Sequence, residues 1–213
     1  MSALFKRFTI GNITQLAATQ QKDQRRMRQT LAEAFPALAD SWDDVLPRRQ
    51  DIMIVPVSAS PADAAAGVEN PSSGVELICL VSEDKREFHV AFFQLPSGEI
   101  LPHLRVLHRF PWMLPRHQCD IGGCKYVVSG AAVMAPGLNH PTGGAVAPNV
   151  AEGAIVGVYI EGKQHAVAVG IARQSSAAIV SGNAGVAIEN THHLGDGLWW
   201  VPVLSQAKLA ARK

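Results

Sequence analysis

The sequence is short of charge. Charged residues make up 17% of its 213 residues, and the formal net charge at pH 7 is +1. A protein that holds nucleic acid by bulk electrostatic attraction carries a clear excess of positive charge, so this class is disfavoured. The apolar fraction of 47% is enough for a buried core. We therefore expect a folded protein, in which any contact with RNA depends on local patches and backbone groups.

Cysteines and long apolar runs are also scarce. The three cysteines, Cys79, Cys119 and Cys124, are too few for a disulfide framework and are typical of reduced thiols. Cys119 and Cys124 have no second pair to complete a zinc ribbon. No run of eighteen apolar residues occurs, and the N-terminus lacks the pattern of a secretory signal. We expect no membrane contact and a cytoplasmic location.

Glycine, by contrast, is abundant in one half of the chain. Fourteen of the eighteen glycines lie between Gln118 and Trp200. Because glycine adopts positive φ freely, this density is typical of tight turns and closely packed strands. The long helical pattern lies in the other half. The change in composition predicts a domain boundary near residues 115–118.

The predicted fold class is α+β. Residues 1–116 are predicted to form an N-terminal domain of helices and strands, with a flexible insert at about 58–74 that is rich in Ala, Ser, Pro and Gly. Residues 117–203 are predicted to form a small, partly open barrel of short strands, followed by a C-terminal tail at 204–213. Predicted helices lie at 13–35, 104–110 and 129–137. Predicted strands lie at 51–57, 75–81, 89–94, 153–160, 165–172, 185–189 and 197–203.

Four basic residues crowd one stretch of the first predicted helix, against a single acidic neighbour, Asp23. One interpretation is a solvated helix face. The other is a basic patch that faces ribosomal RNA or another acidic surface. The four residues are Lys22, Arg25, Arg26 and Arg28.

No catalytic or metal-binding constellation is apparent. His192 and His193 are adjacent, so on a strand they point to opposite faces, and no cysteine or acidic cluster completes a metal site. Asp196 has no nucleophile or second carboxylate at a recognisable spacing, which favours a turn or strand-entry role. A GxxxxGK[ST] phosphate loop is absent. We expect neither an enzyme nor a bound cofactor or metal.

Several segments resemble a known family. The run CDIGGCKYVVSGAAVMAPGL (119–138) resembles the opening of a PUA domain, and residues 156–172 and 185–199 continue it. The EGKQHA hairpin and the DGLW ending resemble one PUA family more specifically, the malignant T-cell-amplified sequence proteins. LFKRF (4–8) and the segment 101–120 resemble the N-terminal domain of that family. The resemblance covers nearly the whole chain except the insert.

This resemblance implies a non-catalytic translation factor. Such proteins form a heterodimer with density-regulated protein and bind the 40S ribosomal subunit through its RNA. The pair promotes release of deacylated tRNA and mRNA after termination, supports re-initiation, and can place initiator tRNA in the P site. The expected partners are therefore density-regulated protein, the 40S subunit and tRNA.

The resemblance also implies site residues. A PUA domain contacts RNA in a groove between its first helix and its later strands, where backbone amides can approach phosphates closely. Tyr126 lies where the family presents an exposed aromatic residue, so we expect it to bind the partner protein. The residues expected to frame the RNA groove are Ser129, Gly130, Ala131, Met134, Pro136, Gly137, Lys163, Gln164, His165, Asn190 and His192.

Two other functions stay open at this point. PUA domains also occur in RNA-modifying enzymes, but the first 116 residues are too few for the catalytic domain that such an enzyme needs. The chain could instead be a stand-alone RNA-binding protein of ribosome biogenesis that has no density-regulated partner.

Overall fold

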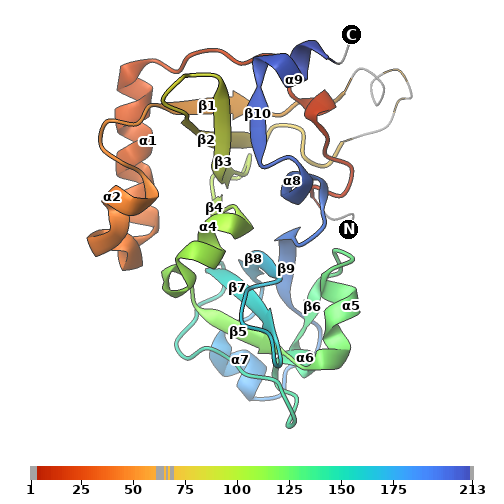
Figure 1. Cartoon of the computed structure of the whole chain (residues 1–213). Helices are drawn as coiled ribbons and strands as arrows, with labels where there is room; N and C mark the ends of the chain where they lie inside the picture. The colour runs from red at the N-terminus through yellow and green to blue at the C-terminus, as the bar shows by residue number, and fades with distance from the viewer. Residues whose placement is uncertain (1–3, 61–64, 66, 68–69, 212–213) are drawn as a thin grey trace.

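The computed structural model describes residues 4–60, 65, 67 and 70–211. Two bodies stack end to end, each built around a five-stranded sheet (Figure 1). The first body comprises η1 (Ile10–Asn12), α1 (Gln21–Ala34), η2 (Pro36–Ser41), α2 (Trp42–Val45), β1 (Ile52–Pro56), β2 (Glu76–Val81), β3 (Glu87–Gln94), β4 (Ile100–Pro102), α4 (Leu104–Arg109) and η3 (Pro111–Met113).

The first sheet has the order β1-β2-β3-β10, and β4 pairs with β3 beside β10. All of its neighbouring strands are antiparallel. One face of the sheet is covered by α1, whose Met27 and Leu31 are buried. These apolar residues recur at helical spacing on one side of α1, and that side packs against the sheet.

The first helix begins later than the sequence predicts. Residues 13–20 are not helical, because this segment covers the open edge of β1. The Thr19 hydroxyl accepts a hydrogen bond from the Ile54 N–H at 2.8 Å, and the Gln24 side chain accepts one from the Ile52 N–H at 2.9 Å. These contacts satisfy backbone donors that an edge strand otherwise exposes. No helix in the described ranges is long and apolar enough to cross a membrane.

The predicted flexible insert is only partly described, since residues 61–64, 66, 68 and 69 lie outside the described residues. Its last part is packed, which corrects the prediction there. Ser72 is fully buried, and its N–H and hydroxyl both donate to the Asn70 carboxamide oxygen. The Gly74 N–H donates to the Val57 carbonyl and so continues the ladder between β1 and β2.

The second body is a curled sheet with the order β5-β7-β8-β9-β6. Strand β5 runs parallel to β7, and the other pairs are antiparallel. Gln118 forms an isolated bridge with Ala145 on the free side of β5. No pairing joins β5 to β6 in the described residues, so the curled sheet is a partly open barrel. Its elements are β5 (Arg116–Cys119), η4 (Ile121–Gly123), α5 (Cys124–Val127), β6 (Val133–Met134), α6 (Ala135–Leu138), β7 (Ile155–Ile160), β8 (Ala168–Ala172), α7 (Ser176–Val180) and β9 (Val186–His193).

The predicted hairpin at 153–160 and 165–172 is confirmed as β7 and β8. The predicted helix at 129–137 is wrong, because α5 ends before it. Gly130 has a φ of 88°, which favours glycine, and its N–H donates back to the Val127 carbonyl as the helix closes. The chain then forms β6 and the short helix α6.

The predicted strand at 197–203 and the predicted tail at 204–213 also differ from the structure. Asp196 caps a short helix, α8 (Gly197–Trp200), through the Trp199 N–H at 2.8 Å. The chain then returns to the first sheet as β10 (Val203–Ser205), which pairs with β3. Leu204 is fully buried, which explains why this segment is held as a strand. A helix, α9 (Gln206–Ala210), ends the described chain.

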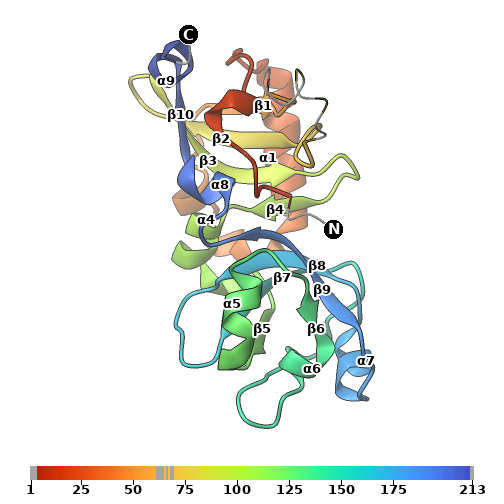
Figure 2. The same ribbon diagram turned by 90° about the vertical axis from the view of Figure 1, so that its right-hand side faces the viewer.

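The two bodies share an apolar core at their junction. Tyr159, Val169 and Ile171 of the second sheet belong to the same buried cluster as the first sheet. The N-terminal segment lies beside α8 and above β9 (Figure 2), where the Gly197 N–H donates to the Phe5 carbonyl at 2.9 Å. The α+β class is confirmed, and the junction fixes the position of the second body against the first.

Candidate functional site

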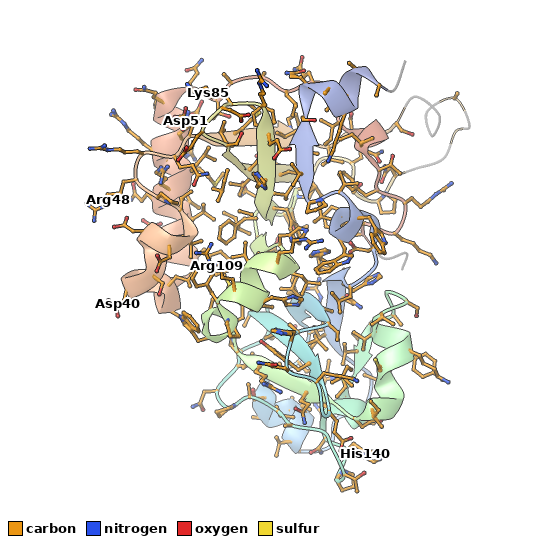
Figure 3. The ribbon with its side chains drawn as sticks, viewed as in Figure 1. Asp40, Arg48, Asp51, Lys85, Arg109 and His140 are labelled. Atoms are coloured by element: carbon orange, nitrogen blue, oxygen red, sulfur yellow. The ribbon has the colours of Figure 1, made fainter. Side chains whose placement is uncertain are left out.

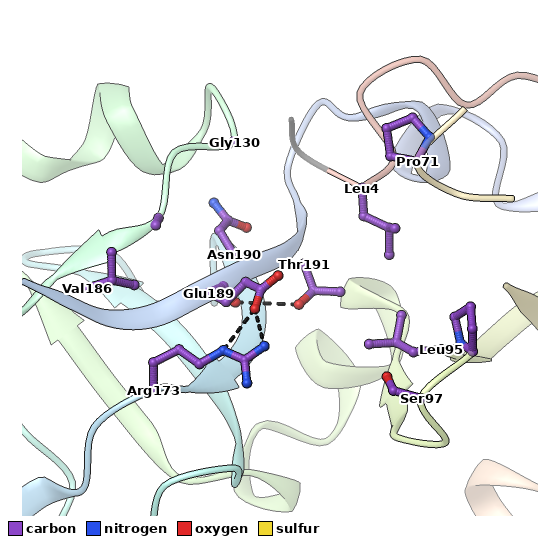
Figure 4. A pocket seen from close by; sticks show the side chains of 12 residues that line it. Leu4, Pro71, Leu95, Ser97, Gly130, Arg173, Val186, Glu189, Asn190 and Thr191 are labelled. Atoms are coloured by element: carbon purple, nitrogen blue, oxygen red, sulfur yellow. Dashed lines mark hydrogen bonds and ion pairs between the residues drawn. The ribbon is translucent and has the colours of Figure 1, made fainter. Parts of the chain in front are cut away.

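A cleft of about 720 Å³ lies between the two bodies (Figure 4). Both bodies contribute a wall, so the cleft exists only because the junction holds them together. The first body provides Leu4, Pro71, Leu95, Pro96 and Ser97. The second provides Gly130, Ala132, Arg173, Val186, Glu189, Asn190 and Thr191.

The floor of the cleft is the second half of β9. The register between β8 and β9 skips Thr191, which marks a β-bulge. Gly170 of β8 lies so close that a Cβ atom there would be 2.2 Å from the Glu189 carbonyl oxygen. Bulges redirect side chains, so this irregularity lets consecutive residues of β9 face the cleft.

Asn190 joins β9 to the loop after α5. Its side chain is 6% exposed, and its amide nitrogen donates to the carbonyl oxygens of Val127 at 2.9 Å and Ala131 at 3.1 Å. Figure 4 shows the side chain directed toward the Gly130 loop. No described residue donates a hydrogen bond to its carboxamide oxygen. Asn190 therefore fixes the cleft wall and leaves one acceptor unsatisfied.

The charges of the cleft nearly cancel. Arg173 forms an ion pair with Glu189, with the guanidinium Nε 2.9 Å from the carboxylate (Figure 4). A hydrogen bond from the Ser97 hydroxyl lowers the pKa of Glu99, and the charge of Arg173 lowers it further. The positive charge of Arg173 thus acts on the carboxylates of both Glu189 and Glu99. The lining residues offer no uncompensated cation to a phosphate.

The loop after α5 holds the first group of predicted RNA-binding residues. Ser129 and Ala131 are exposed, and Gly130 is half-buried on the cleft wall. Since Asn190 binds the Ala131 carbonyl, the structure brings this group and Asn190 together.

A second, apolar groove of about 470 Å³ lies on the other side of that loop. Tyr126 is 57% exposed at its edge, with the Lys125 ammonium over its ring, and Met134 is 48% exposed. Pro136 is exposed nearby on α6, but it does not line the groove. The groove is lined by Cys119, Gly123, Tyr126, Val127, Ala131, Ala132, Val133, Met134 and Gly137.

The turn between β7 and β8 is separate from the cleft. Lys163, Gln164 and His165 are exposed, and none of them lines either the cleft or the apolar groove. The His165 ring instead lies 5.1 Å from the His108 ring on α4. The structure therefore does not bring this predicted group together with Asn190.

His192 has no exposed surface, which corrects its assignment as an RNA contact. Its Nδ1 lies 2.7 Å from the Asp196 carboxylate, and its ring packs against Phe5 and Phe93. Asp196 also accepts hydrogen bonds from two backbone N–H groups. Burial opposes ionisation of Asp196, but His192 and these hydrogen bonds prevail and lower its pKa. Asp196 is thus a structural carboxylate of the junction.

His103 completes this buried junction from the first body. Its ring centre lies 4.8 Å from that of His192, and its Nδ1 accepts a hydrogen bond from the Arg105 N–H at 3.1 Å. Its Nε2 lies 3.3 Å from the Leu198 carbonyl and donates to it. Burial lowers the pKa of His103 well below its ordinary value, and the charge of His192 adds to this. Both nitrogens are therefore engaged by a neutral ring.

The predicted basic patch on α1 is reduced by one member. Arg28 does not face solvent freely, because its guanidinium donates to the carbonyl oxygens of Leu46, Pro47 and Gln50. Burial lowers the pKa of Arg28, against the raising effect of Asp51. The three remaining members are exposed, and they are Lys22, Arg25 and Arg26.

Sequence reasoning missed most of the cleft. Arg173, Glu189 and Thr191 carry no recognisable motif, and the first-body wall comes from a β-turn and the N-terminal segment. These residues are far apart in the sequence, and they lie together only because β9 extends to the junction between the two bodies. The one local signal is the glycine at position 170, whose lack of a side chain allows the bulge.

An α+β body followed by a curled five-stranded barrel, with a cleft at the loop after its first helix, defines a PUA-domain protein. A family model described as "elF2D, PUA domain" matches residues 123–197, and one described as a "Pre-PUA-like domain" matches residues 5–111. A hypothetical protein of Pyrococcus horikoshii OT3 has the same fold, with a TM-score of 0.62 and 22% identity, covering 87% of this chain and 98% of that chain. The predicted PUA pseudo-barrel is confirmed.

Curated relatives narrow this class. Human malignant T-cell-amplified sequence 2 is 34% identical over 200 residues, which cover 92% of this chain and 97% of the relative. Translation machinery-associated protein 20 of Eremothecium gossypii is 34% identical over 198 residues, with the same coverage. The chain belongs to the malignant T-cell-amplified sequence family, as the sequence resemblance predicts.

Proposed function

We propose that this chain is a non-catalytic, translation-associated protein that holds RNA in the cleft between its two bodies. The name of the relative from Eremothecium gossypii, translation machinery-associated protein 20, supports the association with translation. The PUA domain supports the binding of RNA.

The geometry around Asn190 is the single observation that carries the choice of this cleft. Asn190 binds the carbonyl groups of Val127, at the end of α5, and of Ala131 in the loop that follows, so the cleft wall is preformed rather than ordered on binding. Its carboxamide oxygen is buried and has no donor among the described residues, so it becomes an acceptor for a base amino group only when the side chain is uncovered. Apolar groups from Leu4, Pro96 and Val186 provide surfaces for a base face.

The revised RNA site is smaller than the sequence prediction. Of the predicted residues it keeps Gly130 and Asn190, which line the cleft, and it adds Ala132 and Thr191. Ser129 and Ala131 flank Gly130 but do not line the cleft, and Ala131 lines the apolar groove. Met134, Pro136 and Gly137 lie toward the apolar groove, and the turn at 163–165 is a separate surface. The carboxylates give no general base, because Glu189 is ion-paired and Asp196 is buried as a helix cap. Binding without catalysis is the function that this arrangement favours.

The more specific role follows from the family. We propose that the chain pairs with density-regulated protein and binds the 40S subunit, where the pair promotes release of tRNA and mRNA, re-initiation and placement of initiator tRNA. The apolar groove beside Tyr126 supports a protein partner, since an exposed aromatic residue next to an apolar pocket suits an interface hot spot.

Val186→Glu tests the RNA site. Val186 is 40% exposed and lines the cleft, so a carboxylate there repels phosphates without disturbing the core. We expect its affinity for purified 40S subunits to fall about tenfold. Val180→Glu on α7 is the matched control, because Val180 is 62% exposed and lies outside the cleft. Equal affinity of the two variants would contradict the site.

Tyr126→Asp tests the partner surface. We expect it to weaken co-purification with density-regulated protein while leaving the melting temperature unchanged, because the side chain is exposed. Undiminished co-purification would reject this surface. Recovery of precursor-rRNA particles without the partner would instead favour a stand-alone role in ribosome biogenesis.

A further inference from the structure

A rigid turn at the N-terminal end of the described chain borders the cleft. Leu4, its first residue, lines the cleft, and residues 4–7 form a hydrogen-bonded turn. Phe5 is fully buried and Phe8 nearly so, and the Phe8 N–H donates to the Phe5 carbonyl at 3.1 Å. The Phe5 ring packs edge-on against Phe93 of β3 at 5.0 Å. Both ends of the turn are thus anchored in the core.

The same turn is tied to the second body. The Gly197 N–H donates to the Phe5 carbonyl at 2.9 Å, and a Cβ atom at Gly197 would lie 2.0 Å from the Phe8 carbonyl oxygen. The Phe5 ring also packs against His192 at the end of β9. This close approach fixes the turn relative to the strand that forms the cleft floor.

Between the two anchors, the turn exposes two adjacent cations, Lys6 and Arg7. Neither forms a salt bridge with a carboxylate of the described residues. They are the next charged residues along the chain after Leu4 of the cleft wall. Their side chains are free to take an anionic partner.

The cleft itself has no such group. Arg173 is paired with Glu189, and the charge of the same guanidinium also lowers the pKa of Glu99. Phosphate contacts contribute a large share of the affinity of protein–nucleic acid complexes, so an RNA strand that places a base in the cleft is held more tightly when a cation lies near its phosphates. The cation has to come from the rim.

We propose that Lys6 and Arg7 bind the RNA backbone at the rim of the cleft, so that the first body contributes phosphate contacts to an RNA held by the PUA domain. This inference rests on the proposed function. A preformed turn loses little conformational entropy on binding, which favours it over a flexible basic arm. The chain's near-zero net charge is then compatible with RNA binding, because two cations are placed where they are needed.

The double variant Lys6→Gln/Arg7→Gln tests this proposal. Both side chains are exposed, so the melting temperature should not change. We expect its affinity for purified 40S subunits at physiological salt to fall about tenfold. The slope of log affinity against log salt concentration should become shallower by about one to two, as two phosphate contacts require. The matched control is Lys85→Gln/Arg86→Gln, which removes the same charge from two exposed residues that lie between β2 and β3 and do not line the cleft.

The outcomes separate this inference from the proposed function. Weaker binding and a shallower slope for the Lys6/Arg7 variant alone support it. If Val186→Glu loses binding while the Lys6/Arg7 variant matches the wild type, the RNA cleft stands and the role of the turn is refuted. Equal losses in the Lys6/Arg7 and Lys85/Arg86 variants would mean a general charge effect, which also refutes it. Absence of 40S binding by the wild-type chain would overturn both.

Discussion

The two sheets of this protein treat their open edges differently. In the first sheet, the outer edge of β1 is covered by side chains of Thr19 and Gln24, and the Lys208 ammonium donates to the Val203 carbonyl of β10. In the second sheet, β6 pairs with β9 only as far as Ile188, so one edge of β9 is open from there to the junction, while its other edge stays paired with β8. There its side chains form the floor of a cleft.

The difference separates a scaffold from a site. Covered edges protect the first sheet against pairing with other chains. This open-edged part of β9 is held by β8, by Asn190, which binds the Val127 and Ala131 carbonyls, and by the junction at its end. The first sheet therefore supplies stability and the second supplies a preformed surface. The pair at Lys85 and Asp51, at the end of the first body remote from the cleft, is consistent with a solvated scaffold surface (Figure 3).

Removing Asp196, which links the two bodies at the junction, should cause the largest loss of unfolding free energy. Asp196→Ala deletes the partner of His192, the cap of α8 and an acceptor for the His193 N–H. We expect the free energy of unfolding in urea to fall by about 3 kcal/mol or more, because a buried polar network loses its centre. Asp196→Asn, which keeps the shape, should lose less. A change below about 1 kcal/mol in Asp196→Ala would show that the junction does not hold the bodies together.

Asn190→Ala should damage the site more than the scaffold. It removes the donor of the Ala131 carbonyl and one of the two donors of the Val127 carbonyl, which keeps the Gly130 N–H, at a cost of about 2 kcal/mol in the free energy of unfolding. Loss of the fixed wall should also weaken 40S binding. The exposed Asn183→Ala is the control and should change neither quantity. A folded Asn190→Ala with full 40S affinity would contradict the preformed cleft.

Acid should destabilise the junction through His103 at a higher pH than that at which carboxylates take up protons. His103 is neutral in the folded protein because its pKa is lowered by burial, whereas the unfolded chain takes up a proton near the ordinary value of 6.5. The unfolded state then binds more protons, so the free energy of unfolding falls with pH below about 6.5, by up to about 1.4 kcal/mol per pH unit. Burial lowers the pKa of His108 and His117 as well, which adds in the same direction.

His103→Asn isolates this contribution, since asparagine keeps the cap on the Arg105 N–H and cannot titrate. Unfolding in urea between pH 5 and pH 8 should show a shallower pH dependence in this variant than in the wild type. Identical slopes would exclude His103 as the source. Asp196, with its lowered pKa, should add its own loss of stability only near pH 4 and below.

The smallest effect is expected at the covered edge of the first sheet. Gln24→Ala and Thr19→Ala each remove one acceptor from a backbone donor of β1, and each should cost about 1 kcal/mol of unfolding free energy. Gln21→Ala, exposed on the same helix, should cost nothing comparable. Binding to 40S subunits should be unchanged. A loss of 40S binding in Gln24→Ala would contradict the assignment of the first sheet as a scaffold and the second as the binding site.

Local patterns predict the parts of this fold that depend on neighbours in sequence. The β7–β8 hairpin follows from two apolar, β-branched runs around a turn. The start of α1 cannot be predicted in this way, because the Thr19 hydroxyl accepts a hydrogen bond from the Ile54 N–H, thirty-five residues away, and Thr19 therefore lies outside the helix. In the same way, Leu204 becomes a strand only through pairing with Phe88.

The site is predictable only in part for the same physical reason. The family resemblance predicts that Gly130, Ala131 and Asn190 frame the RNA groove, and the structure brings these three residues together. His192 has the same sequence context as Asn190, yet the bulge at Thr191 and the proximity of Phe5 bury it. The rim residues Lys6 and Arg7 gain a role only from the return of the chain to the junction.

Ultraviolet cross-linking of the chain to 40S subunits, read by mass spectrometry of the peptides, tests the central claim most directly. RNA held in the cleft should give cross-links on residues 4–8, 129–132 and 186–191. Val186→Glu should reduce all three together. Cross-links confined to the turn at 163–165 or to α1 would contradict a cleft between the two bodies as the RNA site.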